Sequence, residues 1–202
     1  MLFKASELTR KQAYAILESV VVPRPLAFIT TVSPEGIVRA APHSFFNVVN
    51  DEPPMVAFSA GSRELGKICT VLNVETTNEF VVNMVTEEIL DAVVEASVDH
   101  PRKVSEIEVT KLKTVRSELV RPPRIAASPV SLECRLWQQI PLYPIKKTRG
   151  NVLTIGKVLL IHVDDALLTR GKLDVKKVEA IGRLAGDWFV PTTARIKRKH
   201  PR

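Results

Sequence analysis

The segment from residue 23 to residue 54, PRPLAFITTVSPEGIVRAAPHSFFNVVNDEPP, constrains the fold more than any other part of the sequence. Its prolines are too frequent for a helix, because proline removes a backbone donor and clashes with the preceding helical turn. The segment is nevertheless apolar enough to be buried. Two β-rich runs, residues 26–32 and 37–41, flank Ser33-Pro34-Glu35-Gly36 and predict a hairpin closed by that turn. We therefore expect rigid, buried β structure here.

The remaining pattern alternates strands with a few helices. Thr9 and Gln12 have capping-box spacing, which predicts a short helix before Pro23. Strands are predicted at residues 55–59, 79–85, 130–140 and 151–163, and helices at 67–75 and 87–97, the latter with Ile89, Leu90, Val93 and Val94 buried. Residues 100–124 are expected to be mostly irregular. Short strands without strict βαβ order predict a mainly β fold, an antiparallel barrel with peripheral helices.

Length and composition bound the domain organisation. A chain of 202 residues with 45% hydrophobic and 25% charged residues is expected to form a single domain, residues 1–202, around one core. The net charge of +7 indicates an attraction to anions, which nucleic acid, a membrane surface or a phosphorylated small molecule could each satisfy. Much of the excess charge lies in residues 195–202, which we expect to be a solvated basic tail.

Several classes of protein are disfavoured by missing motifs. Cys69 and Cys134 fit no metal-ligand spacing, the histidines show no paired spacing, and no GxSxG, GxGxxG or P-loop motif is present. We expect free thiols and no metal. Aromatic residues are only 5% and do not alternate with Lys or Arg, which argues against nucleic-acid binding. No segment has the apolar length of a membrane span or a signal peptide, so we expect a cytoplasmic protein without a membrane partner.

Polar side chains gather where the predicted strands end, and we expect three adjacent strands to present them at one rim. The hydroxyl and amide groups are those of Thr30, Thr31, Ser44, Asn47 and Ser59, with Phe45 or Phe46 as an apolar wall. Ser62, Arg63, Lys67 and Thr70 precede or open a predicted helix, whose N-terminus favours an anion. A planar heteroaromatic ligand with polar edges and a phosphate tail would use all of these groups, and flavin mononucleotide (FMN) fits that description. The ordinary alternative is a set of turn hydroxyls, a capped helix and core phenylalanines.

The order of motifs resembles the flavin reductase-like, FMN-binding split-barrel family, which includes flavoredoxins and reductase components of two-component monooxygenases. The matching segments are PRPLAFITTVSPEG, AAPHSFFNVVNDEPPMVAFS, TVLNVETTNEFVVNMV, PPRIAASPVSLECRL, GKVLLIHVDD and GRLAGDWF, in family order from residue 23 to residue 189. The resemblance implies a Greek-key split barrel that forms a homodimer and binds FMN near the subunit interface.

The resemblance also implies site residues. Thr30 and Thr31 match strand positions close to the flavin, and Ser44, Phe45, Phe46 and Asn47 match the segment along the ring edge. Ser59 matches a serine near the ring or ribityl chain, and Thr70 and Asn73 match the phosphate-side helix. Lys67 lies one position upstream of the usual lysine, so Arg63 is a second candidate for the phosphate. Gly186 and Trp188 belong to a late glycine-rich motif, in which Trp188 either covers the flavin or packs in a dimer. His43 stands at a position that is often aromatic, and its role stays open.

Three functions follow as hypotheses. The first is an oxidoreductase in which NADH or NADPH reduces FMN, which then passes electrons to an acceptor such as a monooxygenase; no acid or base is needed, and Asn47 is the candidate for tuning the flavin. The second is an FMN-binding electron carrier or flavin-sequestering protein without nicotinamide activity. The third, a basic nucleic-acid-binding barrel that uses the C-terminal tail, is disfavoured by composition.

Overall fold

The computed structural model describes residues 1–63, 66–142 and 150–199, with the backbone alone at residues 62, 63, 66 and 67. Its helices are η1 (Ala5–Glu7), α1 (Arg10–Val20), α2 (Cys69–Thr77), α3 (Glu87–Glu95), α4 (Glu106–Thr110) and η2 (Asp165–Leu167). Its strands are β1 (Arg24–Pro25), β2 (Ala27–Val32), β3 (Val38–His43), β4 (Phe46–Asp51), β5 (Pro54–Arg63), β6 (Gly66–Lys67), β7 (Glu79–Met84), β8 (Thr114–Val115), β9 (Arg124–Ile125), β10 (Val130–Pro141), β11 (Asn151–Val163), β12 (Leu168–Thr169), β13 (Lys172–Leu173), β14 (Ile181–Arg183) and β15 (Phe189–Pro191).

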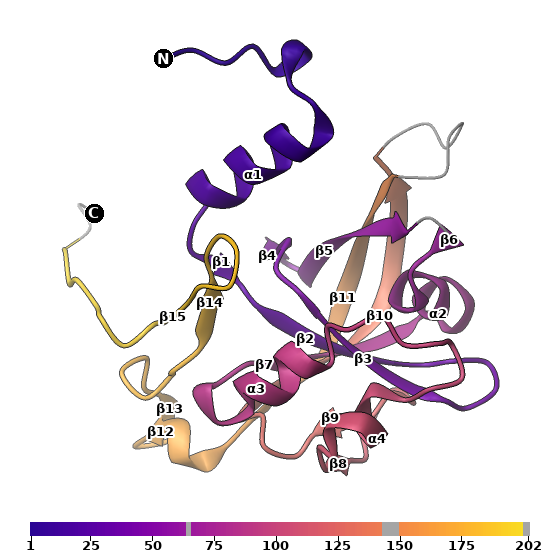
Figure 1. The fold of residues 1–202 in the computed structure, drawn as a ribbon. Coiled ribbons are helices and arrows are strands. Elements are labelled where there is room, and N and C mark those ends of the chain that lie inside the picture. Colours follow the sequence, from indigo (N-terminus) through magenta and orange to yellow (C-terminus); the bar gives the residue numbers. More distant parts are fainter. Residues whose placement is uncertain (64–65, 143–149, 200–202) are drawn as a thin grey trace.

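One antiparallel sheet organises the molecule (Figure 1). Its order is β3-β2-β7-β10-β11-β5-β4, with β6 paired to β5. Strands β3 and β5 also contact each other although the sheet order separates them, so the sheet curls into a barrel. The structure thus confirms the predicted mainly β barrel with peripheral helices.

Strand β2 is buried on both of its faces. Ala27 and Ile29 belong to one hydrophobic cluster with Phe58, Phe80 and residues of α2. Leu26 and Phe28 belong to a second cluster with Ile89 of α3 and Ile125 of β9. Since side chains alternate across a strand, the two clusters lie on opposite sides of the sheet.

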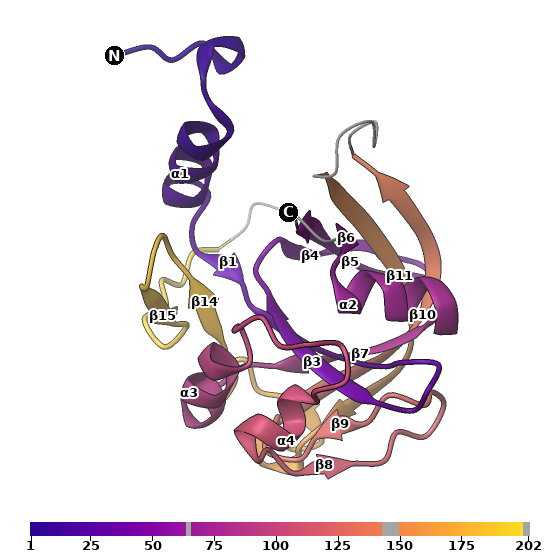
Figure 2. The ribbon, with the colours of Figure 1, turned by 45° about the vertical axis from the view of Figure 1, so that its right-hand side comes forward.

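The helices differ in how they meet the barrel. Helix α2 contributes Val71 and Val74 to the first cluster, and α3 contributes Ile89 and Val93 to the second. Helix α1 has no buried residue and projects from the barrel beside β1 in both views (Figures 1 and 2). No helix in the described ranges of the chain is long and apolar enough to cross a membrane.

A buried ion pair fastens the segment between α3 and β9 to the sheet. Arg39 of β3 and Glu106 of α4 are each 5% exposed, and Arg39 Nε donates to Glu106 Oε2 at 2.7 Å. The same carboxylate accepts from Ala40 N at 3.1 Å, and Arg39 Nη1 donates to Pro101 O at 3.0 Å. Two charges removed from water are stable here because each is bonded to the other.

Most predicted elements are present, with differences at particular places. The capping box of Thr9 and Gln12, the hairpin of β2 and β3, the strand at 151–163 and the two free cysteines are confirmed. The helix predicted at 67–75 begins at Cys69 and ends at Thr77. The prediction that Val94 belongs to the buried face of α3 was wrong, because Val94 is 44% exposed. Strand β4 was not predicted. Of the predicted basic tail, residues 200–202 lie outside the described part of the chain.

Loss of one partner from the buried ion pair should be costly. We predict that Glu106→Gln lowers the free energy of unfolding by about 3–5 kcal/mol, because it leaves a buried guanidinium without its counter-charge. Arg121→Gln is the control: it breaks the pair between Arg121 and Glu79, in which Arg121 is 59% exposed, and should cost less than about 1 kcal/mol. Urea denaturation measures both, and equal stabilities of the two variants would contradict the assignment.

Candidate functional site

Two pairs of buried polar side chains join β2 and β3 to helix α2. Asn73 Nδ2 donates to Thr31 Oγ1 at 3.0 Å, and His43 Nε2 lies 3.3 Å from Thr70 Oγ1. All four residues are less than 9% exposed. The structure therefore brings together three of the predicted residues, Thr31, Thr70 and Asn73, and adds His43 to them. The His43 ring also lies against Phe58, with 5.0 Å between the ring centroids.

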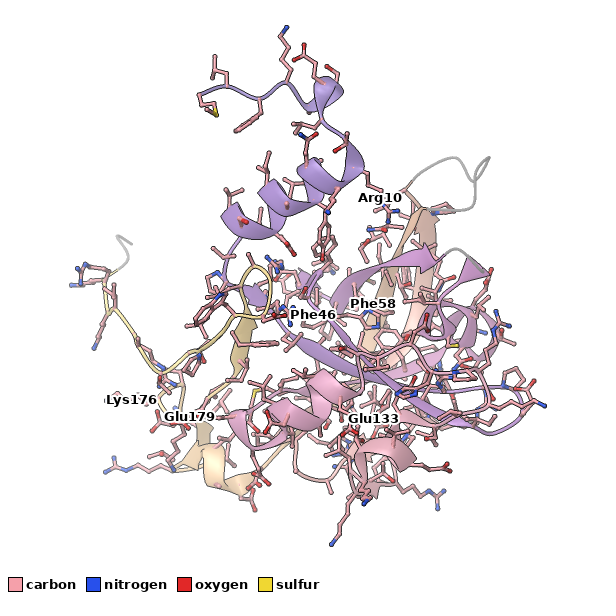
Figure 3. All side chains as sticks on the ribbon, viewed as in Figure 1. Arg10, Phe46, Phe58, Glu133, Lys176 and Glu179 are labelled. Atoms are coloured by element: carbon pink, nitrogen blue, oxygen red, sulfur yellow. The ribbon has the colours of Figure 1, made fainter. Side chains whose placement is uncertain are left out.

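The second group of predicted residues lies where β4 meets β5. Phe46 is paired with Phe58 in the strand register and packs against the hydrophobic cluster that contains Phe58; Figure 3 labels both residues. Ser59 N donates to Phe45 O at 2.8 Å. The Ser59 hydroxyl is buried and has no hydrogen-bond partner within the described residues. Because a buried polar group without a partner costs free energy, this hydroxyl fits a site that a polar ligand completes.

Helix α2 begins directly after the β5–β6 pair, so its N-terminus lies near the C-terminal end of β5. The N-cap residue is Ile68, whose apolar side chain cannot accept a hydrogen bond from the first turn. Thr70 lies in that turn. Free backbone N–H groups with a hydroxyl beside them form a suitable place for a phosphate. The side chains of Arg63 and Lys67, predicted as phosphate contacts, lie outside the described residues; their backbone forms the β5–β6 hairpin just before the helix.

Two predicted residues are directed elsewhere. Thr30 is fully buried and its hydroxyl donates to Pro123 O at 2.6 Å, because it faces the opposite side of β2 from Thr31. Asn47 is exposed on β4, and its side-chain oxygen accepts from Val48 N at 2.8 Å.

The order of the strands also differs from the prediction. Strand β5 is separated from β2 and β3 in the sheet order, so the expectation of three adjacent strands was wrong. Strand β5 contacts β3 where the barrel closes instead.

Ser44 and the start of the turn that contains Gly186 and Trp188 are joined by a residue that sequence reasoning missed. Arg24 of β1 is 6% exposed and donates to Leu184 O at 2.7 Å, while its Nε lies 3.4 Å from Ser44 Oγ. Leu184 begins a tight turn in which Gly186 has φ of +56° and Trp188 is 74% exposed. The sequence feature that could have identified Arg24 is an arginine between two prolines in an otherwise apolar segment.

Aromatic side chains extend the site toward α1. The rings of Tyr14 and Phe45 lie 6.3 Å apart, and Phe45 is 38% exposed. Partial burial raises the pKa of Tyr14, and the neighbouring Glu18 carboxylate adds to this. Tyr14 is therefore a neutral phenol at physiological pH.

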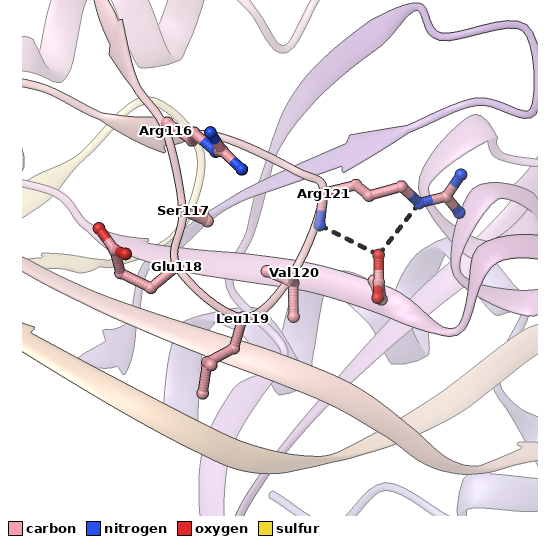
Figure 4. A pocket seen from close by; sticks show the side chains of 7 residues that line it. Arg116, Ser117, Glu118, Leu119, Val120 and Arg121 are labelled. Atoms are coloured by element: carbon pink, nitrogen blue, oxygen red, sulfur yellow. Dashed lines mark hydrogen bonds and ion pairs between the residues drawn. The ribbon is translucent and has the colours of Figure 1, made fainter.

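A separate depression of about 400 Å³ lies at the other end of α2 (Figure 4). It is formed by Glu79, which follows the C-cap of the helix, and by residues 116–121. Two carboxylates hold this loop: Glu79 accepts from Arg121 N at 3.1 Å, and Glu133 accepts from Glu118 N at 2.8 Å and Leu119 N at 2.6 Å. Three backbone donors of the loop, those of Glu118, Leu119 and Arg121, are thus already used.

Glu133 also pairs with His162, whose Nε2 lies 2.6 Å from Glu133 Oε1. Burial acts to raise the pKa of Glu133, but the two backbone donors and His162 outweigh burial, so the pKa is lowered. His162 therefore has a structural role as the partner of a buried carboxylate. The candidate site for a ligand remains the one at the N-terminus of α2.

The fold and this candidate site define a class: a mainly β barrel with buried polar side chains between β2, β3 and α2 and a buried hydroxyl on β5. The model of the flavin reductase like domain matches residues 19–175. A protein of Aquifex aeolicus without an assigned function is 37% identical over 98% of this chain and all of its own. The chain belongs to the flavin reductase-like family, which places it among flavoproteins of the oxidoreductase class.

Solved structures agree with this membership. Nitrilotriacetate monooxygenase component B from Bacillus cereus has a TM-score of 0.93 and 31% identity, with 98% of each chain covered. The 2-nitrobenzoate 2-nitroreductase of Pseudomonas fluorescens has a TM-score of 0.89 and 28% identity, covering 100% of this chain and 96% of its own.

Proposed function

We propose that the chain is an NAD(P)H-dependent flavin reductase that binds FMN and passes its electrons to a separate acceptor. The observation that carries the proposal is the buried Ser59 hydroxyl of β5, which has no partner among the described residues; the uncapped N-terminus of α2 follows β5 through the β5–β6 pair. One group suits the polar edge of a flavin ring and the other suits a phosphate. Bound flavin would supply the redox chemistry.

The residues of the chain have binding and positioning roles in this proposal. Phe45 and Phe46 supply apolar surface for the ring, and Ser44 and Ser59 supply hydroxyls for its edge. Thr70 and the first turn of α2 hold the phosphate. No side chain need transfer a proton, because hydride transfer from a nicotinamide depends on placing the two rings in contact.

The acceptor is proposed from the relatives. The likeness to a monooxygenase component B supports delivery of reduced flavin to a monooxygenase. The likeness to a nitroreductase makes a nitroaromatic compound the second candidate for the acceptor.

Nicotinamide oxidation tests this function. We predict that catalytic amounts of the purified protein accelerate oxidation of NADH or NADPH by free FMN under air, measured as the fall in nicotinamide absorbance. Heat-denatured protein is the control for the uncatalysed reaction. If the protein binds FMN but neither nucleotide is oxidised above the control rate, the chain is an electron carrier or flavin-sequestering protein rather than a reductase.

Thr70 tests whether the ligand carries its phosphate at α2. Thr70→Val, which removes only the hydroxyl, should weaken FMN binding about tenfold and riboflavin binding less than about twofold, because only FMN has the phosphate. Thr76→Val is the matched control, since Thr76 is exposed on the same helix and bonds Leu72 O. Fluorescence titration gives both dissociation constants, and equal weakening of the two flavins would reject the assignment.

We also propose that the chain is a homodimer whose interface includes α1. Tyr14, Leu17 and Val21 share one face of the helix and are 54%, 56% and 56% exposed. On the sheet edge, Val48 and Val49 of β4 are 67% and 52% exposed. A helix of this length is marginal without packing, so a second copy that covers this apolar face accounts for its presence.

A charge on that face should prevent dimerisation. We predict a mass of two chains for the wild type by light scattering and of one chain for Leu17→Glu, because burying a carboxylate in an apolar interface is costly. Ser19→Glu, on the opposite side of α1, should remain a dimer. A monomeric wild type, or a dimeric Leu17→Glu, would contradict the proposed interface.

A further inference from the structure

Arg24 joins three segments that are far apart in the sequence. Its Nη1 donates to Glu18 O at 2.6 Å and to Val21 O at 3.0 Å, which are carbonyls at the C-terminal end of α1. Its Nη2 donates to Leu184 O at 2.7 Å in the turn after β14. These three short bonds fix the plane of the guanidinium, and its remaining nitrogen, Nε, is directed at Ser44.

The electrostatic setting of Arg24 is unusual for a buried arginine. Its hydrogen bonds to the described residues go to neutral carbonyls and a hydroxyl, and none goes to a carboxylate. Arg39, equally buried, is instead paired with Glu106. Carbonyls at a helix C-terminus carry partial negative charge, which stabilises a cation there but does not neutralise it. Arg24 thus has no carboxylate among its hydrogen-bond partners in the described residues, and its strand contacts β4.

The direction of the Arg24–Ser44 contact has a chemical consequence. A guanidinium has only donors, so Ser44 Oγ must accept from Arg24 Nε, at 3.4 Å. The hydroxyl proton of Ser44 is then left to donate to another group. Ser44 is half-buried and directly precedes Phe45, Phe46 and Asn47. In this position it is a hydrogen-bond donor whose orientation is set by its neighbour.

We propose that Arg24 is a positioning residue of the flavin site, which holds Ser44 as a donor toward the ring edge and ties α1 and the Leu184–Trp188 turn to the same strand. The inference rests on the proposed flavin binding. The turn is closed by Leu184 N and Trp188 O at 2.9 Å, so fixing Leu184 also fixes Gly186 and Trp188. One side chain thereby aligns two segments that lie far apart in the sequence.

Substitution of Arg24 tests this role through flavin affinity. Arg24→Gln should weaken FMN binding about tenfold or more, and Arg24→Lys, which keeps the charge but not the planar set of donors, should restore part of the loss. Ser44→Ala should weaken binding too, and the double variant Arg24→Gln/Ser44→Ala should lose less than the product of the two single effects, because both act through one contact.

A general loss of stability must be separated from the proposed role. Glu133→Gln is the control, since it removes a fully buried carboxylate that holds the loop at residues 118–119, remote from Ser44. It should lower the melting temperature and leave the dissociation constant of FMN within about twofold of the wild type. If Arg24→Gln changes FMN affinity no more than Glu133→Gln does, or if the two losses at Arg24 and Ser44 multiply fully, the inference is overturned.

Hydrogen exchange of the flavin-free protein gives a readout that does not depend on the ligand. Arg24→Gln should increase amide exchange at the C-terminal turn of α1 and in the Leu184–Trp188 turn together, with β10 and β11 unchanged. Unaltered exchange in either segment would refute the link between them. If the wild type binds no flavin, the proposed function fails and Ser44 has no such ligand, whereas the exchange result still decides whether Arg24 ties the two segments.

Discussion

The two-sided burial of β2 is the constraint on which the rest of the structure depends. Each of its residues from Ala27 to Val32 is buried, so both faces require a cover. Helix α2 and the barrel interior cover one face, and α3 with β9 covers the other. A strand in this position must be mainly apolar, and each polar side chain on it needs an internal partner.

The same burial decides where polar atoms can lie. Thr30 and Thr31 are adjacent and both fully buried, so each needs an internal partner. The Thr31 hydroxyl accepts a hydrogen bond from Asn73 on α2. The Thr30 hydroxyl donates to the carbonyl of Pro123, in the segment that the ion pair of Arg39 and Glu106 holds to β3. One threonine therefore belongs to the candidate site, and the other belongs to the packing of the opposite face.

Local sequence signals predicted two kinds of element. The capping box at Thr9 predicted a helix from its terminal hydrogen bonds although none of its residues is buried, and the alternation in β10 predicted a strand from its buried side chains. Strand β4 has almost entirely exposed side chains, so no alternation revealed it, and only its pairing with β5 makes it a strand. Val94 was predicted to be buried for a related reason. Helical periodicity shows which residues share a face of α3, but the neighbouring elements decide how much of that face they cover.

The family resemblance predicted more of the candidate site residues than the chemistry of the individual side chains did, yet neither identified Arg24. Its importance comes from contacts with Glu18, Val21 and Leu184, and the last of these is a long way along the chain. Backbone carbonyls are present at every residue, so no sequence pattern distinguishes the ones that accept from a particular arginine. The glycine-rich turn was predicted from the family resemblance, whereas its attachment to β1 became visible only in the fold.

His43, whose role the sequence left open, acquires one from the geometry. Its Nε2 lies 3.3 Å from Thr70 Oγ1, and the tautomer of the ring decides which atom donates. If Nε2 lacks a proton, Thr70 donates to it and has no proton left for a phosphate, which accepts hydrogen bonds only. If Nε2 carries the proton, Thr70 accepts from His43 and its own hydroxyl proton can be given to the ligand. Phosphate binding at Thr70 therefore requires the Nε2–H form of His43, just as Arg24 leaves Ser44 its proton: in both places a buried donor sets the direction of a hydroxyl at the site.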